Sequence, residues 1–452
     1  MRKNRKWMGL LLGVVSLFQI NILSVQAEEY WPEGPTVEGE AAIVMEASTG
    51  TVLYEKNADE QLYPASITKI MTALLAVENS SMDEQVTFSM DAVYKTEGSG
   101  ISRDVDEVMS MKDCLYGLML ESSNECAYAI AEHVGGTYDN FVQMMNEKAA
   151  ELGCTHTHFN NPHGLPDENH YTCARDMALI SQEALKNETF RLITSTRRYT
   201  IPPTNKHAQE TYLTNHHKML NNWRGDSTYL YDGCIGGKTG YTSVADSTLV
   251  TFAERDGMTL ICVVMKEKAP GHYVDTTNLL NYCFENFQLW NVAENEQNYT
   301  SDKMENKIFA KEESFLSVDS QGFIVLPKAA AFTDAVPEVV EDTKAADKVG
   351  TIQYTYAGRN VGGADIKING AKVAQFPFDK AQTTNKKEKV VNINIKYILI
   401  GILVAVILVG VGFGIYHFAD NFYLIRYKFG SKRPKGFKKI KQRKNRRRRR
   451  WF

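Results

Sequence analysis

The chain has 452 residues, too many for one ordinary hydrophobic core, so its length favours two domains with appended segments. Hydrophobic residues make up 43% and charged residues 23%, a globular composition that excludes disorder as the main state of the chain. The net charge of -3 hides an uneven distribution, because an acidic middle lies between two basic ends.

Residues 1–27 have the pattern of a secretory signal peptide. A basic start is followed by an apolar run from Met8 to Ile22 and by the small-residue sequence Val25-Gln26-Ala27. An uncleaved anchor helix is the alternative, although Asn21 and Ser24 interrupt the apolar character. In either case the sequence predicts that the acidic middle is exported.

Residues 28–295 are predicted to form a domain in which strands and helices share one mixed sheet. Two short apolar runs around Ser48-Thr49-Gly50 predict a hairpin, and apolar residues at helical spacing predict a helix that starts near Ser66. Further helices are expected at Met111–His133, Tyr138–Leu152 and Ala174–Leu185, and further strands at Leu249–Ala253 and Thr259–Met265. Because strands are predicted before and after the helices, we expect the chain to leave the sheet and return to it.

Residues 296–378 are predicted to form a small all-β domain, because short alternating runs such as Gly350–Tyr356 and Ala364–Ile368 are typical of strands. The polar and charged residues 379–396 predict a linker. The stretch 397–418 contains no Asp, Glu, Lys or Arg and is long enough to span a bilayer as one helix.

Residues 419–452 carry fifteen Lys and Arg residues, which mark the cytoplasmic side of a membrane. Contact with anionic membrane lipid explains this tail better than nucleic-acid binding, which we do not expect. The sequence therefore predicts a single-pass protein of the cell membrane, with its folded part outside and its C-terminus in the cytoplasm.

The seven cysteines have no paired or metal-like spacing, and several lie within apolar runs. Free buried thiols are therefore expected rather than a disulfide framework. The cysteines are Cys114, Cys126, Cys154, Cys173, Cys234, Cys262 and Cys283.

Three short motifs each occur once, and their order in the chain is informative. They are Ser66-Ile67-Thr68-Lys69, Ser122-Ser123-Asn124 and Lys238-Thr239-Gly240. Alone, each is usually structural: a helix start with an exposed lysine, a turn or cap, and a hairpin turn. Together, on a helix start, a helical region and a glycine-rich strand, they favour one functional site over three separate structural roles.

The first motif places a base beside a nucleophile. Residues three apart on a helix share a face, so Lys69 presents its amine beside the Ser66 hydroxyl. A lysine can act as base if burial and a second cation keep it partly neutral, and Lys238 is the candidate for that cation. The Ser66 N–H at a helix start and a second N–H from a strand would form an oxyanion hole.

The third motif lies in a strand with the glycines Gly236, Gly237 and Gly240, which let a substrate backbone approach. Lys238 and Thr239 offer a cation and a hydroxyl, so a substrate with a free terminal carboxylate is expected. Ser122 would relay a proton to the leaving amine, and Asn124 would hold an amide on the acyl side of the substrate.

These motifs resemble those of the low-molecular-mass penicillin-binding proteins, the serine-type D-alanyl-D-alanine carboxypeptidases. Residues 161–165, Tyr171 and residues 174–178 are similar to the family's segment between the second and third motifs. Residues 232–242 are similar to its third-motif strand, and the predicted β domain resembles its second domain. The resemblance covers residues 35–375.

The resemblance implies a β-lactamase/transpeptidase-like catalytic domain of mixed α/β class, with an antiparallel sheet flanked by helices, followed by the small all-β domain. It implies that Ser66, Lys69 and Ser122 are catalytic and that Asn124, Lys238, Thr239, Gly240 and Tyr241 bind the substrate. The Tyr241 N–H would join that of Ser66 in the oxyanion hole. The implied substrate is the peptidoglycan pentapeptide ending in D-Ala-D-Ala, the implied inhibitors are β-lactam antibiotics, and no cofactor or metal is implied.

Two features depart from the family pattern. Lys266 and Lys268 stand where the family often has an arginine, which affects how the carboxylate would be held. A spanning helix at 397–418 replaces the family's usual amphipathic anchor, which changes attachment and not chemistry.

Related activities remain open at this point. A β-lactamase would need a deacylating carboxylate, and Glu183 with Asn187 has loosely that spacing, although Glu183 falls on a predicted solvated helix face. A penicillin sensor without turnover is disfavoured because the basic tail is too short to fold as an output domain. An endopeptidase or transpeptidase of the same chemistry is harder to exclude.

A metal enzyme is the remaining alternative. Four histidines cluster in the sequence at His156, His158, His163 and His170, but no His-Glu-x-x-His motif is present. We therefore expect ordinary loop histidines, with a structural role for His163.

Overall fold

The computed structural model describes residues 30–222, 225–296, 316–341 and 348–368. The predicted signal peptide, linker, membrane helix and basic tail all lie outside these residues. Within the described ranges, no helix combines the length and the apolar character needed to cross a membrane.

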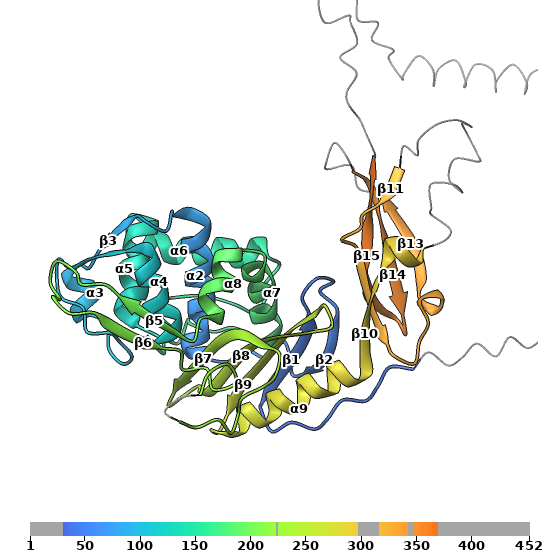
Figure 1. The fold of residues 1–452 in the computed structure, drawn as a ribbon, viewed down its shortest axis with the longest axis horizontal. Helices are drawn as coiled ribbons and strands as arrows, with labels where there is room; N and C mark the ends of the chain where they lie inside the picture. Colours follow the sequence, from blue (N-terminus) through green and yellow to red (C-terminus); the bar gives the residue numbers. More distant parts are fainter. Residues whose placement is uncertain (1–29, 223–224, 297–315, 342–347, 369–452) are drawn as a thin grey trace, which may run out of the picture. The chain divides into compact units, whose positions relative to one another are not determined.

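A five-stranded antiparallel sheet forms the centre of the first part of the chain (Figure 1). Its strands are β1 (Ala41–Glu46), β2 (Val52–Lys56), β7 (Cys234–Thr242), β8 (Asp246–Arg255) and β9 (Met258–Glu267). They lie in the order β2-β1-β9-β8-β7, so the N-terminal hairpin pairs through β1 with the last strand, β9. The prediction that the chain leaves this sheet and returns to it is confirmed.

Alternating residues of the strands point to opposite faces of this sheet, as the pleat of a strand requires. In β1, Ala41, Ile43 and Met45 belong to the core shared with most of the helices, whereas Ala42 and Val44 belong to the core beneath α9. All six residues of β1 are buried. Both faces are therefore covered, which explains why β1 is an unbroken apolar run.

The helical layer lies on one face of the sheet, and α9 lies on the other (Figure 1). The helices are α2 (Lys69–Asn79), α3 (Met90–Tyr94), α4 (Met111–Leu120), α5 (Asn124–Gly135), α6 (Tyr138–Glu151), α7 (Ala174–Leu185), α8 (Glu188–Ser195) and α9 (Gly271–Asn286). Two small two-stranded sheets complete this part, β3 (Gln85–Thr87) with β4 (Val108–Ser110) and β5 (Arg198–Ile201) with β6 (Thr211–Thr214).

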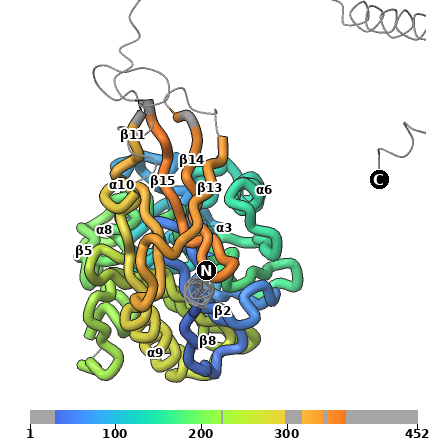
Figure 2. The backbone as a smooth tube through the Cα atoms, turned by 90° about the vertical axis from the view of Figure 1, so that its right-hand side faces the viewer, coloured from blue at the N-terminus to red at the C-terminus, as the bar shows by residue number. Residues whose placement is uncertain are grey.

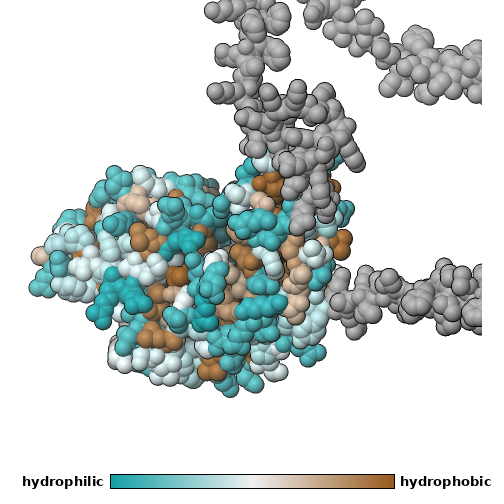
Figure 3. All heavy atoms as spheres, turned by 45° about the vertical axis from the view of Figure 1, so that its right-hand side comes forward, coloured by the Kyte–Doolittle hydropathy of each residue, from teal (hydrophilic) through white to brown (hydrophobic). Residues whose placement is uncertain are grey.

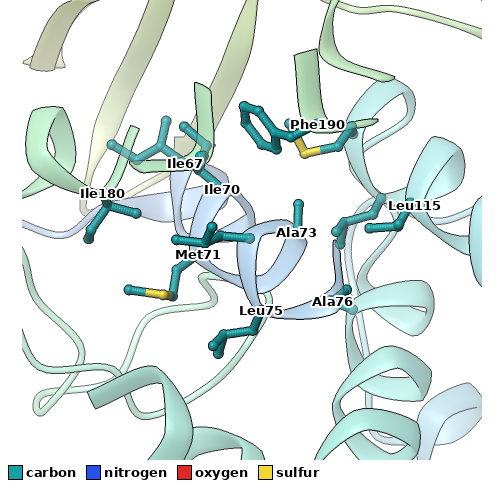
Figure 4. Packing of buried hydrophobic residues seen from close by; sticks show 14 of the residues in the cluster. Ile67, Ile70, Met71, Ala73, Leu75, Ala76, Leu115, Ile180 and Phe190 are labelled. Atoms are coloured by element: carbon teal, nitrogen blue, oxygen red, sulfur yellow. The ribbon is translucent and has the colours of Figure 1, made fainter. Parts of the chain in front are cut away.

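Helix α2 lies in the middle of the helical layer and is buried on all sides over its first eight residues. Its residues Ile70, Met71 and Ala73 pack with Leu115 of α4, Phe190 of α8 and other neighbours (Figure 4). A helix that is apolar on every face has no stable position at a surface. The element that follows Ser66 is therefore rigidly placed by packing.

Two expected helices differ from the observed ones, both at motif serines. The predicted helix Met111–His133 is wrong as a single helix, because α4 ends at Leu120 and α5 begins at Asn124. Ser122 between them has a left-handed backbone (φ 61°), which ends one helix before the Ser123 hydroxyl caps the next. Ser66 lies in a 3-10 turn, Ala65–Thr68, and α2 starts only at Lys69.

A second, six-stranded antiparallel sheet follows α9 (Figure 2). Its strands are β10 (Phe287–Asn291), β11 (Leu316–Val318), β12 (Phe323–Pro327), β13 (Val336–Glu341), β14 (Lys348–Tyr356) and β15 (Arg359–Ile368), accompanied by the short helix α10 (Val292–Asn295) and the 3-10 turn Phe332–Asp334. β10 pairs with β12, so this sheet takes in residues before the predicted boundary at 296. The apolar run Phe287–Trp290 directly continues α9, and the sequence pattern alone does not separate the two.

All seven cysteines are free thiols, and five of them are buried.

On the face shown in Figure 3, apolar residues of the described ranges are scattered among hydrophilic ones. Scattered apolar residues are normal for a folded surface.

Two carboxyl groups meet where β9 leads into α9. Asp275 Oδ2 accepts hydrogen bonds from the N–H groups of Glu38 at 2.7 Å and Gly39 at 2.9 Å, which keeps this carboxylate in place. Glu267 is buried beside it, and burial together with the Asp275 carboxylate raises the pKa of Glu267 from 4.5 to about 8. The folded chain therefore holds a proton here at neutral pH.

This proton predicts a pH-dependent stability. Between pH 4.5 and pH 8 the unfolded chain has lost the proton of Glu267 while the folded chain keeps it, so stability falls as pH rises through that window. Glu267→Gln should remove this contribution, and the stability of the variant relative to wild type should increase from pH 5 to pH 8 in thermal unfolding. Glu285→Gln, at an exposed position on α9, is the matched control. Equal pH slopes for wild type and Glu267→Gln would contradict the assignment.

Candidate active site

Ser66 lies in a tight turn whose backbone is held by a neighbouring loop. Ala65, directly before it, has a left-handed backbone (φ 50°), a conformation that costs energy in a residue with a side chain. Gly164 packs so closely on this turn that a Cβ there would collide with the Ala65 carbonyl oxygen. The loop therefore fixes the position of the Ser66 hydroxyl, which stays half-exposed while its neighbours are buried.

The Lys69 amine is completely buried and has three oxygen partners. Its Nζ lies 3.0 Å from Ser66 Oγ, 2.7 Å from Asn124 Oδ1 and 2.6 Å from the His163 carbonyl oxygen. These three atoms come from the turn before α2, the start of α5 and the loop before α7. The amine therefore joins the first two motifs.

The second motif forms the turn between α4 and α5. Ser122, Ser123 and Asn124 are all buried. The Asn124 N–H donates to the Ser99 carbonyl at 2.8 Å, and its side-chain Nδ2 donates to the Glu97 carbonyl. This leaves Asn124 Oδ1 directed at Lys69, so the asparagine is oriented by backbone on one side and by the amine on the other.

The third motif lies on β7, the end strand of the five-stranded sheet. Lys238 Nζ donates to Ser122 Oγ at 3.1 Å and to the Thr239 carbonyl at 2.8 Å. A Cβ on Gly240 would lie 2.9 Å from the Ser66 nitrogen. Glycine at this position therefore lets β7 approach the turn of Ser66, and the three predicted motifs meet in one place.

Both lysines of the site have depressed pKa values. Burial, and then the neighbouring Lys238 cation, hold the pKa of Lys69 well below its usual 10.5. Burial lowers the pKa of Lys238 to about 7. Removing an ammonium group from water and placing a like charge nearby both favour the neutral amine. Lys69 can therefore be neutral and act as the base for Ser66, as expected from the sequence.

The remaining predicted site residues lie on β7 beside this centre. Thr239 is half-buried, and Tyr241 is 68% exposed. Beside the second motif there is a cavity of about 260 Å³, lined by residues that include Glu97, Gly98 and Glu125. The exposed Tyr241 therefore leaves this part of β7 accessible from solvent.

Lys266, which stands near the position of the family's arginine, is engaged elsewhere. Its amine forms an ion pair with Glu40 at 2.7 Å. Glu183, the residue considered as a deacylating carboxylate, pairs with Lys186 at 2.7 Å, and Asn187 caps α8. These partners give Glu183 and Asn187 ordinary roles in the helical layer.

Two of the four clustered histidines form hydrogen bonds with residues of the first motif. His163 contributes its carbonyl to Lys69. The His170 Nδ1 accepts from the Asn160 N–H at 2.9 Å, so its Nε2 carries the proton and donates to Thr68 Oγ1 at 2.9 Å. Burial lowers the pKa of His170 to about 3, which keeps it neutral.

The sequence analysis did not find the His163 carbonyl or the left-handed turn residues Ala65 and Ser122. A carbonyl group carries no side-chain signal. Gly164 was the available clue, because a glycine in this loop permits the close backbone approach that carries the carbonyl to Lys69.

Comparisons with known proteins agree with this geometry. A family model described as D-alanyl-D-alanine carboxypeptidase, peptidase S11, matches residues 28–269. The D-alanyl-D-alanine carboxypeptidase DacF of Bacillus subtilis is 32% identical over 358 residues, which cover 77% of this chain and 86% of that protein. DacC of Escherichia coli, with the same description, is 29% identical over 374 residues, covering 78% and 88%.

Solved structures give the same result for the first part of the chain. The Streptomyces K15 DD-transpeptidase is 31% identical with a TM-score of 0.52, covering 56% of this chain and all of that one. A D-alanyl-D-alanine carboxypeptidase from Mycobacterium tuberculosis is 29% identical with a TM-score of 0.51, covering 57% and 95%. The mixed α/β transpeptidase-like fold is thereby established, and the chain belongs to the D-alanyl-D-alanine carboxypeptidase family of serine-type peptidases.

Proposed function

We propose that this protein removes the terminal D-alanine from peptidoglycan stem peptides through an acyl-enzyme on Ser66. The observation that carries the proposal is the environment of the Lys69 amine. Of its three oxygen partners, Asn124 Oδ1 and the His163 carbonyl can only accept hydrogen bonds, whereas the Ser66 hydroxyl can also donate.

A neutral amine has two hydrogens and one lone pair. With both hydrogens directed to Asn124 Oδ1 and the His163 carbonyl, the lone pair is left for the Ser66 hydroxyl. The depressed pKa of Lys69 supplies this neutral form. Lys69 would then take the proton of Ser66 as its oxygen attacks the carbonyl of the penultimate D-alanine.

Lys238 and Thr239 would hold the terminal carboxylate, since they offer a cation and a hydroxyl on the end strand beside Ser66. The backbone N–H groups of Ser66 and Tyr241 would stabilise the oxyanion, a role supported by the close approach of Gly240 to the Ser66 nitrogen. Ser122, which accepts from Lys238, would pass a proton to the leaving amine. Water then hydrolyses the acyl-enzyme.

We also propose that the protein acts at the outer side of the cell membrane, with the folded part outside. The support is the sequence of the two ends: the signal-like residues 1–27, the apolar stretch 397–418 and the basic tail. Peptidoglycan as substrate is consistent with this location. Lipid contact through the C-terminal helix belongs to the same proposal.

Replacing the nucleophile tests the reaction directly. Ser66→Ala should reduce the release of free D-alanine from a peptide ending in D-Ala-D-Ala by at least about a thousandfold, because no oxygen remains to be acylated. Covalent labelling by a fluorescent penicillin should be lost together with it. Ser81→Ala, at an exposed serine just past the other end of α2, should leave both readouts unchanged. Release that survives in Ser66→Ala would refute the assignment.

Transpeptidation is a second candidate, because a solved relative over the first part of the chain is a DD-transpeptidase. The two reactions share the acyl-enzyme and differ in whether water or an amine attacks it. With a D-amino acid added as acceptor, a carboxypeptidase should still yield mainly the shortened peptide, measured by mass spectrometry. Formation of mainly the exchanged peptide at millimolar acceptor would favour transpeptidation instead.

The two lysines predict a pH profile for acylation. Penicillin labelling should slow as pH falls through the pKa of Lys69, because the protonated amine cannot accept the serine proton. Lys238→Gln removes the neighbouring cation, so the pKa of Lys69 should rise and this decline should occur at higher pH. Lys186→Gln, at an exposed lysine, should not shift it. An unshifted profile in Lys238→Gln would show that the two amines are not coupled.

A further inference from the structure

A cysteine, a histidine and an aspartate from three separate segments meet outside the catalytic centre. Asp59 follows β2, His156 lies in the loop after α6, and Cys173 precedes α7. One ligand atom from each lies within 4.8 Å of the other two. Thiolate, imidazole and carboxylate are the ligand types that Zn²⁺ prefers.

Backbone hydrogen bonds hold two of the three segments, those of Asp59 and Cys173, together. The Arg175 N–H donates to the Ala58 carbonyl at 3.0 Å, and the Thr172 N–H donates to the Leu62 carbonyl at 3.0 Å. The segments of Asp59 and Cys173 are therefore joined on both sides of the cluster. A metal would not need to assemble its ligands from distant positions.

The buried Asp176 forms hydrogen bonds with the segments of His156 and Cys173. Its Oδ2 accepts from the His156 N–H and from Thr157 Oγ1, both at 2.7 Å. Its own N–H donates to Cys173 Sγ at 3.4 Å. Hydrogen bonds behind the ligands, such as these to the His156 backbone and the Cys173 sulfur, help to orient the ligands of a metal site.

The charges of the cluster also favour a cation. The carboxylates of Glu55, Asp59 and Asp176 gather here, and the Arg175 guanidinium pairs with the first two, at 2.6 Å to Glu55 and 2.7 Å to Asp59. These four groups together carry an excess of two negative charges. Arg175 donates to both oxygens of Asp59, at 2.7 Å to Oδ1 and 3.1 Å to Oδ2, but each carboxylate oxygen has a further lone pair for a metal.

We propose that Asp59, His156 and Cys173 form a binding site for a thiophilic divalent cation, with Zn²⁺ as the best match. The exposed Asp59 and half-buried His156 leave the site open to solvent, so water would complete the coordination. Binding converts the Cys173 thiol to a thiolate and releases one proton to solvent. The cation would join the segment that leads from Asp59 to Ser66 to the loop of His156 and to the start of α7. This is a structural role.

Cobalt titration tests the site, because a thiolate bound to Co²⁺ gives a charge-transfer band. The reduced, metal-free, full-length protein should show a band that saturates at one equivalent of Co²⁺, with release of one proton. Cys173→Ser should abolish the band, while Cys234→Ser, at a half-buried thiol on β7, should keep it. No saturable band in wild type, or a band that persists in Cys173→Ser, would overturn the proposal.

A second variant guards against misfolding of Cys173→Ser. His156→Ala alters a half-buried loop side chain and should weaken Co²⁺ binding at least about tenfold. Added Zn²⁺ should raise the thermal unfolding temperature of wild type and Cys234→Ser, but not that of His156→Ala. An equal rise in His156→Ala would show that Zn²⁺ binds elsewhere.

Discussion

The burial of one lysine amine is the constraint on which the site depends. An ammonium group taken out of water is costly unless it is hydrogen-bonded, and the fully buried amine of Lys69 contacts three oxygens. Satisfying this amine requires that the starts of α2 and α5 and the loop of His163 meet at one point. The packing of the helical layer therefore holds the three oxygen partners around the Lys69 amine.

Backbone strain is the cost of bringing these ends together. Ala65 and Ser122 both adopt left-handed conformations, each next to or within a catalytic motif. The surrounding structure imposes them: Gly164 presses on the carbonyl of Ala65, and the Ser123 cap together with the Ser99 carbonyl fixes the start of α5. The reactive hydroxyls are thus positioned by packing and not by flexible loops.

The residues of the site could be predicted from the sequence better than the boundaries of the helices and strands around them. Ser66, Lys69, Ser122, Asn124 and Lys238 could be assigned to one site from the sequence because their chemistry is expressed in side chains, and the structure brings them into contact. The break between α4 and α5 could not, since apolar residues continue at helical spacing through Met119 and Leu120 up to Ser122 and resume at Cys126. The early start of the second sheet at Phe287 was also missed, because its apolar residues continue the pattern of α9. The Asp59, His156 and Cys173 cluster has no spacing signature at all, since only tertiary contacts join its segments.

The end position of β7 has a further consequence. A strand that keeps its outer edge accessible for a peptide can also pair with the same strand of another copy, which is a route to aggregation. Here the strand is interrupted by a bulge between Cys234 and Gly236, and Gly236 and Gly237 lie far from ordinary strand geometry (φ 142° and 146°). These irregularities shorten the regular edge to a few residues around Thr239. The bulge and the two glycines therefore leave little regular edge on which a second copy of β7 could pair.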